Sequence, residues 1–597
     1  MPKKPIYYTN REFDTIKQSL INYAKRYYAN TFQDFNEASF GAMMVDLVSY
    51  LGDQLSFYAD YQANEVFLDT AIETANVERI AKQMGFKRPG SPQSVGVCDF
   101  FISVPASTTS GGPDSNYLPI LKEGSLVKSD SGAVFTLTRD VDFTLANNEV
   151  TVSRVDSDTG VPTFFAIKAS GPVVSGRLYE EEVEVGDYQR FLRVPMKGEL
   201  VTEILSVIDS QGKEYFQVDY LTQDVVVSRQ ANRGSNRDIV PFIIKTKPCP
   251  RRFVLEYSSE GTAFLQFGYG SEDNLTEDLI ADPADVVLDM NARKYISDRT
   301  FDPSNLIKTD KFGVVPQDTT LTITYRGNSS TVINAAASTV NSISNINLSF
   351  ENRSSLNDSV VTDIINTIEV TNPEPILGDT SGLSLQEFKT RAYANFATQN
   401  RAVTRQDYIS LAYRMPSEFG RVKRVGIEQD PRSSRRNLNM YILSEAINGG
   451  LTTAPSTLKN NLKTWLGRYK MINDSVDILD GKVINFGIEF EVIAEVGQNK
   501  FAILERCIER LGAKYLNVEL EMGEPVYISD IYKVLNRVPG VVDTTIVKLV
   551  NKTGGSYSTY RYEIEKNLSN DGRMLLIPTD SVAEVLFPSL DLTGVVK

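Results

Sequence analysis

The sequence predicts a multidomain α+β protein with an N-terminal helical bundle segment, a mostly-β middle region and C-terminal α+β units. Three observations predict this class. The chain of 597 residues is several times the usual domain length, so several packing units are expected, each able to bury its own core. Apolar residues recur at helical spacing near the N-terminus and in short strand-like runs in the middle. Towards the C-terminus the two patterns alternate.

Residues 1–88 are predicted to form an N-terminal helical interaction module. Their apolar stripes are Phe13, Ile16, Leu20 and Tyr27, then Phe40, Met43, Met44, Leu47, Leu51, Leu55 and Tyr58, then Val66, Ile72, Ala75 and Ile80. Three short helices cannot bury this much aromatic and methionine surface on one another, so a partner helix is implied. The predicted partner-binding residues are Phe40, Met43, Leu47, Tyr58 and Phe67. The alternative is that these helices pack onto the middle region of the same chain.

Residues 89–345 are predicted to be mostly β, because short runs rich in Val, Ile, Phe and Thr are broken by Gly, Pro, Asn and Asp. The clearest predicted strands are 100–104, 134–137, 182–185, 224–227 and 253–257. Residues 105–113 read as a loop. Residues 329–360 are dense in Ser, Asn and Thr, which predicts an extended connector leading into the next region.

Residues 346–430 are predicted to hold this connector and a helical region. Leu385, Phe388, Ala392 and Phe396 have the spacing of one buried helix face. Thr404 stands three residues before Asp407, which predicts an N-cap for a second helix with Tyr408, Leu411 and Ala412 on its apolar stripe. Arg401 and Arg405 flank the joint and could hold a carboxylate or the carbonyls that end the first helix. Spacing alone favours nothing beyond a solvated helix-turn-helix.

Residues 431–597 are predicted to form α+β units. Strands are expected at 438–443, 476–479, 484–496 and 541–550. Helices are expected around Leu458 to Tyr469, around Ile503 to Leu511 and at 528–535. Trp465, the only tryptophan, is expected to be a core residue rather than a binding anchor.

Composition argues against several partners and compartments. The net charge of -14, from 62 basic and 76 acidic residues, offers no electrostatic footprint for nucleic acid or an anionic membrane. No apolar run approaches the roughly 20 residues that span a bilayer, and the first thirty residues are not signal-like, so assembly in the cytoplasm is expected. Cys98, Cys249 and Cys507 are far apart in sequence and are expected to be buried apolar residues rather than disulfides.

The absence of histidine excludes most hydrolase mechanisms, because no Ser-His-Asp triad, Cys-His pair or HExxH zinc site can form. No nucleotide-binding motif occurs, and no cofactor is expected. A glycosidase built on two carboxylates remains possible, although no spacing selects a pair. Asp156, Asp158 and Gly160 begin like a calcium loop but lack its distal Glu, so an acidic turn is expected. The acidic run over 272–285 is expected to be solvated surface.

Residues 401–408, RAVTRQDY, resemble the RAVT-x-x-DY signature of the baseplate J-like proteins of contractile tails and related injection machines. Weaker likenesses follow in the family's order: 64–71 with 81–89, the turn at 267–270, the strand and Gly-Asn turn at 322–328, the approach at 382–387 and the terminal unit at 527–541. Tyr269 stands where the family's FGDG turn has Asp. The opening of the chain is most similar to the large wedge subunits of T4-like contractile-tailed phages.

The resemblance implies a structural baseplate wedge subunit, not an enzyme, that forms a ring around the central hub and relays conformational change to the sheath. Implied partners are a second copy, neighbouring wedge proteins through the helical bundle, and tail hub and sheath-initiating proteins. The implied location is the virion tail baseplate, assembled in the host cytoplasm. Arg401, Thr404, Asp407 and Tyr408 are the implied structural signature. The alternative is a catalytic tail component that degrades cell-surface glycan, which would require two carboxylates converging in a cleft.

Overall fold

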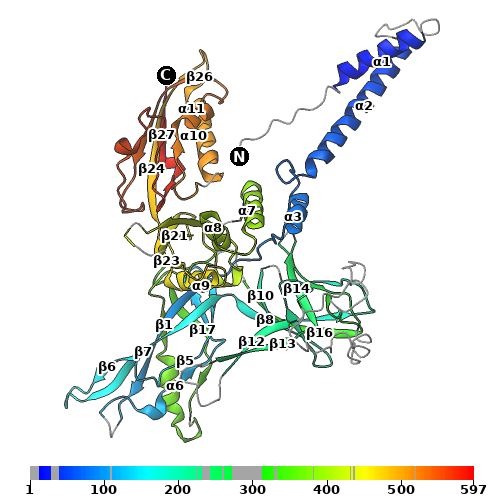
Figure 1. The fold of residues 1–597 in the computed structure, drawn as a ribbon. Helices are drawn as coiled ribbons and strands as arrows, with labels where there is room; N and C mark the ends of the chain where they lie inside the picture. The colour runs from blue at the N-terminus through cyan, green and yellow to red at the C-terminus, as the bar shows by residue number, and fades with distance from the viewer. Residues whose placement is uncertain are drawn as a thin grey trace. The chain divides into compact units, whose positions relative to one another are not determined.

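The computed structural model confirms a multidomain α+β chain (Figure 1). It describes residues 12–28, 39–107, 111–198, 200–223, 225–231, 242–258, 261–271, 312–328, 333–351, 353–380, 382–430, 432–433, 437–517 and 520–597. The described residues form two compact units. The first contains the residues up to Lys87 together with Leu385–Phe396, and the second contains Arg88–Ser384 and Ala397–Lys597.

The first unit is helical, as the N-terminal pattern predicts. Its helices are α1 (Phe13–Tyr27), α2 (Phe40–Glu65), α3 (Thr74–Gln83) and most of α7 (Leu385–Thr398). Ser39 caps α2, because its hydroxyl accepts from the backbone N–H of Ala42 at 3.1 Å. The third predicted stripe is wrong at its start: Val66 and Ile72 lie outside any helix, between α2 and α3, and both are exposed.

Helix α7 completes the first unit. Phe388 packs edge-to-face on Phe86 with ring centroids 5.2 Å apart. The Lys389 ammonium donates to the carbonyls of Asp69 and Ala71 at 3.2 and 2.5 Å, which satisfies the turn after α2. Phe388 and Ala392 are buried as predicted, but Phe396 is 62% exposed, so its predicted place on the buried face is wrong. Helix α7 up to Phe396 belongs to the first unit, whereas the helix that begins at Arg405 belongs to the second.

The second unit begins with an antiparallel sheet in the order β17-β3-β4-β7-β1-β19, with β6 also paired to β7. The bounds are β1 (Val95–Pro105), β3 (Leu126–Ser129), β4 (Val134–Leu137), β6 (Glu149–Val155), β7 (Pro162–Ser175), β17 (Val340–Asn345) and β19 (Glu369–Thr371). The short strands β2 (Ile120–Leu121), β5 (Val141–Asp142) and β18 (Leu348–Ser349) pair beside it. Phe100, Phe135 and Ile167 lie in the core, and α6 (Asp358–Asn366) contributes Val361 and Ile364 to it.

The described part of the expected connector over 329–360 is not a free linker, which corrects the sequence-based interpretation: β17 belongs to the first sheet and β18 pairs with β2, while residues 329–332 and 352 lie outside the described residues. Strand β17 pairs with β3, and Val340 is fully buried. Ser342 and Ser344, two of the serines that made the segment look like a linker, are exposed on β17 and donate to carbonyls of β3 at 3.2 and 3.3 Å. Polar composition therefore reflected a one-sided strand rather than a free connector.

A second sheet has the order β8-β16-β10-β11-β14-β15-β9. Its strands are β8 (Arg177–Val185), β9 (Arg193–Pro195), β10 (Val201–Asp209), β11 (Glu214–Gln217), β14 (Arg252–Tyr257), β15 (Ala263–Phe267) and β16 (Thr319–Gly327). Strands β12 (Val225–Ala231) and β13 (Phe242–Pro248) form a separate hairpin. The predicted strands at 134–137, 182–185 and 253–257 are confirmed; Asp224 of the 224–227 prediction lies outside the described residues. Gly268 is required in its turn, because a Cβ there would lie 1.9 Å from the Phe312 carbonyl oxygen.

Two further sheets make up the C-terminal α+β part. The third sheet holds β20 (Arg424–Gln429), β21 (Asn437–Glu445), β22 (Leu451–Thr453) and β23 (Ser475–Asp480), with α8 (Arg405–Tyr413) and α9 (Ser456–Leu466) packed on it. The fourth holds β24 (Lys482–Ala494), β26 (Val541–Asn551), β28 (Ser581–Glu584) and β29 (Leu592–Val596), with α10 (Lys500–Asn517), α11 (Ile528–Leu535) and α12 (Pro588–Asp591). Strands β25 (Val526–Tyr527) and β27 (Met574–Leu575) pair separately. The alternation predicted from sequence is confirmed.

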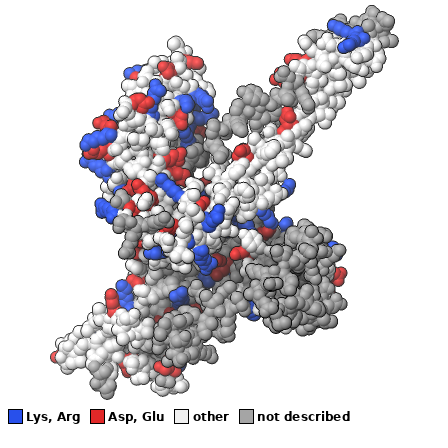
Figure 2. All heavy atoms as spheres, viewed as in Figure 1, with Lys and Arg blue, Asp and Glu red and all other residues white. Residues whose placement is uncertain are grey.

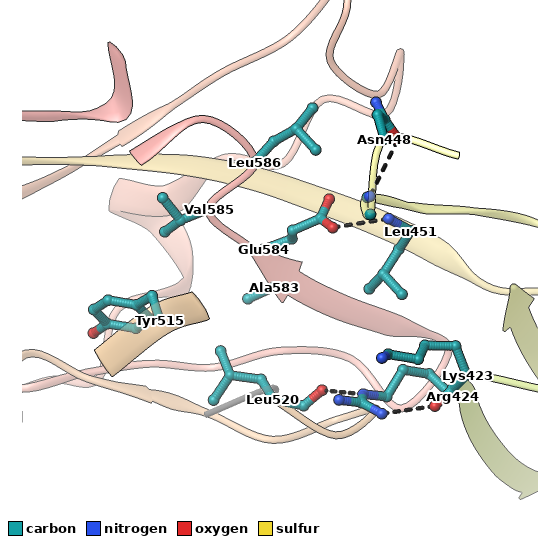
Figure 3. A pocket seen from close by; sticks show the side chains of 12 residues that line it. Lys423, Arg424, Asn448, Leu451, Tyr515, Leu520, Ala583, Glu584, Val585 and Leu586 are labelled. Atoms are coloured by element: carbon teal, nitrogen blue, oxygen red, sulfur yellow. Dashed lines mark hydrogen bonds between the residues drawn. The ribbon is translucent and has the colours of Figure 1, made fainter. Parts of the chain in front are cut away.

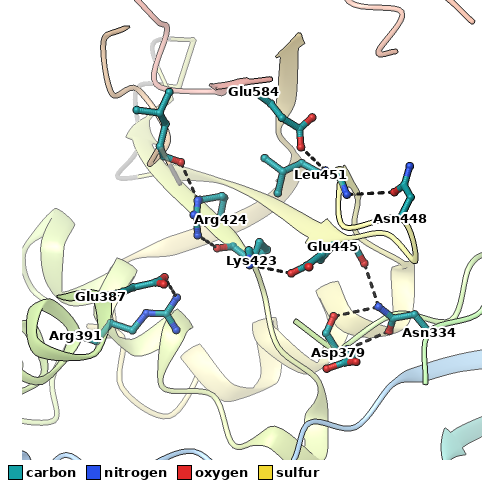
Figure 4. A network of polar contacts seen from close by, with 12 residues as sticks. Asn334, Asp379, Glu387, Arg391, Lys423, Arg424, Glu445, Asn448, Leu451 and Glu584 are labelled. Atoms are coloured by element: carbon teal, nitrogen blue, oxygen red, sulfur yellow. Dashed lines mark hydrogen bonds and ion pairs between the residues drawn. The ribbon is translucent and has the colours of Figure 1, made fainter. Parts of the chain in front are cut away.

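A polar joint ties the first sheet to the third (Figure 4). The Asn334 amide donates to the carbonyls of Asp379 and Glu445 at 3.1 and 3.2 Å, and its oxygen accepts from the Ser94 hydroxyl at 2.7 Å. The Lys423 ammonium lies 2.9 Å from the Glu445 carboxylate in an almost buried ion pair. Removing one partner of such a pair leaves an uncompensated charge, so this joint resists rearrangement.

Candidate assembly surfaces

The first candidate surface is the apolar exterior of α1 and α2. Helix α1 has no buried residue, and the buried residues of α2 are Ser49 and Glu65, which are both polar. The five predicted partner-binding residues Phe40, Met43, Leu47, Tyr58 and Phe67 are between 51% and 73% exposed. Tyr23, Tyr27, Met44, Val48, Tyr50, Leu51, Leu55 and Phe57 are exposed beside them. In Figure 2 the helices α1 and α2 are mostly white, without many charged side chains.

These side chains cover more than one side of α2. Exposed apolar neighbours occur as consecutive pairs at 43–44, 47–48, 50–51 and 57–58, and consecutive residues point about 100° apart on a helix. Helix α1 covers only one side, where Ile16 packs close to Gly52 and Lys17 pairs with Asp46 at 2.7 Å. A helix that is apolar on several sides requires several packing partners.

The turn between α2 and α3 gives a structural role to Glu65, which belongs to the segment 64–71 that resembles the baseplate J-like proteins. Glu65 is buried, and its carboxylate accepts from the backbone N–H of Ile72 at 2.7 Å and from the Asn76 amide at 3.0 Å. Burial raises the pKa of Glu65, but the hydrogen bonds from Asn76 and the backbone outweigh it and hold the pKa below the ordinary value. Glu65 therefore fixes the turn that presents Phe67.

The signature turn is the second candidate surface. Thr404 caps α8 as predicted: its hydroxyl accepts from the Asp407 N–H at 3.2 Å, and the Asp407 carboxylate accepts from the Thr404 N–H at 2.8 Å, which completes a capping box. The Asp407 carboxylate also accepts from the Val403 N–H at 3.2 Å. Tyr408 is buried, as expected of the apolar stripe, and its hydroxyl donates to Asp474 at 2.8 Å. These contacts hold the turn in one geometry.

Arg401 does not have either of its two expected roles. It is exposed, and its guanidinium donates to the side-chain oxygen of Gln399 at 3.2 Å rather than to a carboxylate or a helix-end carbonyl. Arg405 is exposed as well. Both charges therefore face solvent at the start of α8.

The segment 469–472, which the sequence did not connect to the signature, lies beside this turn. Ala402 forms a parallel bridge with Lys470, and its N–H donates to the Tyr469 carbonyl at 3.0 Å. Val403, Met471 and Ile472 are then 54%, 44% and 99% exposed. The sequence signal for the last two was only an apolar pair, Met471-Ile472, in an otherwise polar loop, and nothing in the spacing connected it to residue 403.

A cavity of about 170 Å³ lies at the boundary between the third and fourth sheets (Figure 3). Among its lining residues are Lys423, Arg424, Tyr515 and Glu584. The Glu584 carboxylate accepts from the Leu451 N–H and the Asn485 amide, each at 2.8 Å. Arg424 donates to the Leu520 carbonyl at 2.8 Å. One carboxylate lines this cavity, whereas glycoside hydrolysis uses two that flank the scissile bond.

A second cavity beside α9 likewise has one lining carboxylate, that of Asp477. Two carboxyls elsewhere have raised pKa values. Burial, with Glu203 and Asp219 nearby, raises the pKa of Glu418 to about 7, and burial raises the pKa of Asp379 to about 6. Neither residue lines the two cavities, and Asp379 belongs to the polar joint. These groups therefore do not make a carboxylate pair in either cavity.

The remaining sequence predictions have the following outcomes. Asp156 forms a local turn whose carboxylate accepts from the N–H groups of Asp158 and Thr159. The acidic run over 272–285 lies outside the described residues. Cys98, Cys249 and Cys507 are buried, and none of the three is in a disulfide within the part of the chain that the structure describes. Trp465 packs against the third-sheet core and donates to the Leu411 carbonyl at 2.8 Å, as expected of a core residue.

Within the described parts of the chain, no group of three or more Cys, Asp or Glu side chains is arranged to hold a metal ion. Among the helices that the structure describes, none combines the length and apolar content needed to span a bilayer.

Comparison with known proteins gives one family match. Residues 12–83 match the model of the bacteriophage baseplate protein N-terminal domain. No curated protein matches the chain. Among solved structures, a chain of the anti-feeding prophage baseplate is 9% identical, with 97% of this chain and 100% of that chain covered and a TM-score of 0.27. A chain of the type VI secretion TssK-TssF-TssG baseplate subcomplex is 8% identical, with 72% and 96% covered and a TM-score of 0.24. TM-scores this low do not establish a shared fold, so the family match over α1 to α3 is what supports a structural baseplate component.

Proposed function

We propose that this chain is a structural wedge subunit of a contractile phage tail baseplate, where copies form a ring around the central hub and pass a conformational change to the sheath. The observation that carries the proposal is the exposed apolar surface of α1 and α2, within the residues that match a baseplate N-terminal domain. The RAVT-x-x-DY likeness at 401–408 supports the same role. Residues 1–88 serve as the interaction module in this proposal.

The surface on α2 fits helical partners. Its exposed residues Met43, Leu47 and Leu55 recur at four-residue intervals or multiples of them, the spacing by which a helix packs into a bundle. Monomeric soluble proteins rarely expose contiguous apolar patches beyond a few hundred square ångströms, so a patch of this kind marks an interface. The proposed occupants are helices of neighbouring wedge proteins and of a second copy.

The test uses the full chain mixed with its neighbouring baseplate proteins. Leu47→Glu combined with Leu55→Glu is expected to abolish wedge assembly, because each change places a charge in an apolar interface. Gln62→Glu is the control, since it adds one negative charge at an exposed polar position of α2, whereas the test variant adds two at apolar positions. Assembly is followed by native mass measurement, and circular dichroism confirms the helices.

Wild-type assembly by the Leu47→Glu/Leu55→Glu variant would show that this face is not the interface. A glycan-cleaving activity in the purified chain, with no assembly, would favour the catalytic alternative.

A further inference from the structure

The exposed residues of the signature turn form one compact feature. Because Ala402 bridges Lys470 in parallel register, Val403 and Met471 are adjacent, and Ile472 follows directly. We call Val403, Met471 and Ile472 the signature knob. Arg401, Arg405 and Lys470 are exposed next to these residues in the chain. They outnumber the two carboxylates of the turn, Asp407 and Asp474, so the apolar knob lies in a segment of net positive charge.

The buried residues of the signature hold the knob in place. The Asp407 carboxylate fixes the Val403 backbone through the capping box. On the other side, Tyr408 bonds the Asp474 carboxylate, and the Asp474 N–H donates to the Met471 carbonyl at 3.1 Å. Both chain segments of the knob are thus anchored to the first turn of α8. A preorganised apolar feature gives up little conformational freedom when it binds, which favours a docking role.

A surface of opposite charge lies on β8, the edge strand of the second sheet. Leu178, Glu180, Glu182 and Glu184 alternate along β8 and are all exposed, while Glu181 and Val185 on the other side are buried. We call these four residues the acidic strip. Among the residues that the structure describes, no ion pair compensates Glu180, Glu182 or Glu184. Three like charges on one face repel each other, and a cationic partner would relieve that repulsion.

We propose that the signature knob of one copy docks on the acidic strip of a second copy. The knob cannot pair with another knob, nor the strip with another strip, because like charges would meet. The two surfaces complement each other, which makes the contact heterologous, and heterologous contacts close into rings when the rotation permits. This inference rests on the proposed function and deepens it by naming the faces that meet.

The test measures the mass of the purified full-length chain against concentration and salt, without other baseplate proteins. Wild type is expected to self-associate more weakly as salt is raised. Arg401→Glu with Arg405→Glu should weaken association at least about tenfold, and so should Glu182→Arg with Glu184→Arg, since like charges would then meet. Combining all four changes in one chain should restore association, because the charges are exchanged.

Two controls accompany these variants. Lys500→Glu with Arg510→Glu makes the same charge change as the knob variant at exposed positions of α10, and it should associate as wild type does. Ile472→Ser should weaken association through lost apolar contact and leave the salt dependence unchanged. Circular dichroism confirms folding for every variant.

A monomeric wild type, unchanged association by the knob variant, or a folded four-fold variant that does not associate would each overturn the contact. If the knob proves instead to bind a different baseplate protein, the second copy is the wrong occupant and the proposal also fails. The proposed function is tested separately through α2: loss of wedge assembly in the Leu47→Glu/Leu55→Glu variant would support it even if the knob contact failed.

Discussion

The capping box at the start of α8 gives a ranking of three substitutions. Thr404→Ala removes one acceptor for the Asp407 N–H and should destabilise the first turn by about 1 kcal/mol. Asp407→Ala removes the acceptor of two N–H groups, those of Val403 and Thr404, together with a negative charge at a helix N-terminus. Its expected cost is about 2 kcal/mol. Arg401→Ala removes an exposed contact to Gln399 and should cost less than about 0.5 kcal/mol.

Native-state hydrogen exchange measures how much each of the three substitutions destabilises this turn. A chain of several domains does not unfold in one two-state step, so a single global midpoint would mix unrelated transitions. Exchange of the Val403, Thr404 and Asp407 amides reports local opening of this turn. Since 1.4 kcal/mol is a factor of ten, Asp407→Ala should speed exchange about 30-fold and Thr404→Ala about fivefold. Gln406→Ala, an exposed change in the same turn, is the matched control.

The test depends on the order of the three effects on exchange: Asp407→Ala should have the largest, Thr404→Ala the next and Arg401→Ala the smallest. If Arg401→Ala accelerated exchange as much as Thr404→Ala, the guanidinium would be satisfying helix-end carbonyls after all, and the account of the turn given by its hydrogen bonds would be wrong. If Asp407→Ala and Gln406→Ala had equal effects, the capping box would not hold Val403.

Three further outcomes are expected. Burial raises the pKa of Glu418 to about 7 from an ordinary 4.5, so the fold favours the protonated acid. The free energy of unfolding of the part that contains Glu418 should therefore fall as pH rises from about 4.5 to about 7, by up to about 3 kcal/mol. In calorimetry that resolves the separate transitions, one transition should show this pH dependence in wild type and lose it in Glu418→Gln. Burial raises the pKa of Cys98 to about 12 and of Cys507 to about 11, so a thiol reagent at pH 8 should label them only after denaturation; labelling of native protein would contradict their burial. Tyr408→Phe should cost about 1 kcal/mol and speed exchange of the Asp474 amide, while an unchanged rate there would separate Tyr408 from the knob.

Sequence periodicity predicted the elements whose order depends on local contacts. The capping box at Thr404 and the buried face of α8 follow from residues within one helical turn, and both are confirmed. The prediction was wrong where distant residues decide the conformation. Ile72 has helical spacing, but its N–H donates to the buried carboxylate of Glu65, and the Lys389 ammonium binds carbonyls of the same segment from far along the chain. Such tertiary contacts leave no local pattern to read.

One of the two candidate surfaces could be predicted from the sequence and the other could not. The exposed apolar residues of α2 were predictable, because their number alone exceeded what three helices could cover. The signature knob was not, because Val403 is joined to Met471 and Ile472 only through the backbone bridge between Ala402 and Lys470. A motif read along the chain indicates which residues hold a turn, whereas the surface that the turn presents depends on what lies beside it in space.

Magnitudes explain why the α2 surface needs several partners. Full burial of a Leu, Met or Phe side chain contributes about 1.5–3 kcal/mol, so completing the burial of a side chain that is already about half covered contributes on the order of 1 kcal/mol. Phe40, Met43, Leu47, Leu55 and Tyr58 are 51–73% exposed and would together give about 5–9 kcal/mol, which lies in the lower half of the roughly 4–15 kcal/mol lost on association. Stable association therefore requires the second apolar side of α2, including Met44, Val48 and Leu51, to be covered as well. One helix cannot reach both sides, so the expected assembly is a bundle of at least two partner helices around α2 rather than a simple pair.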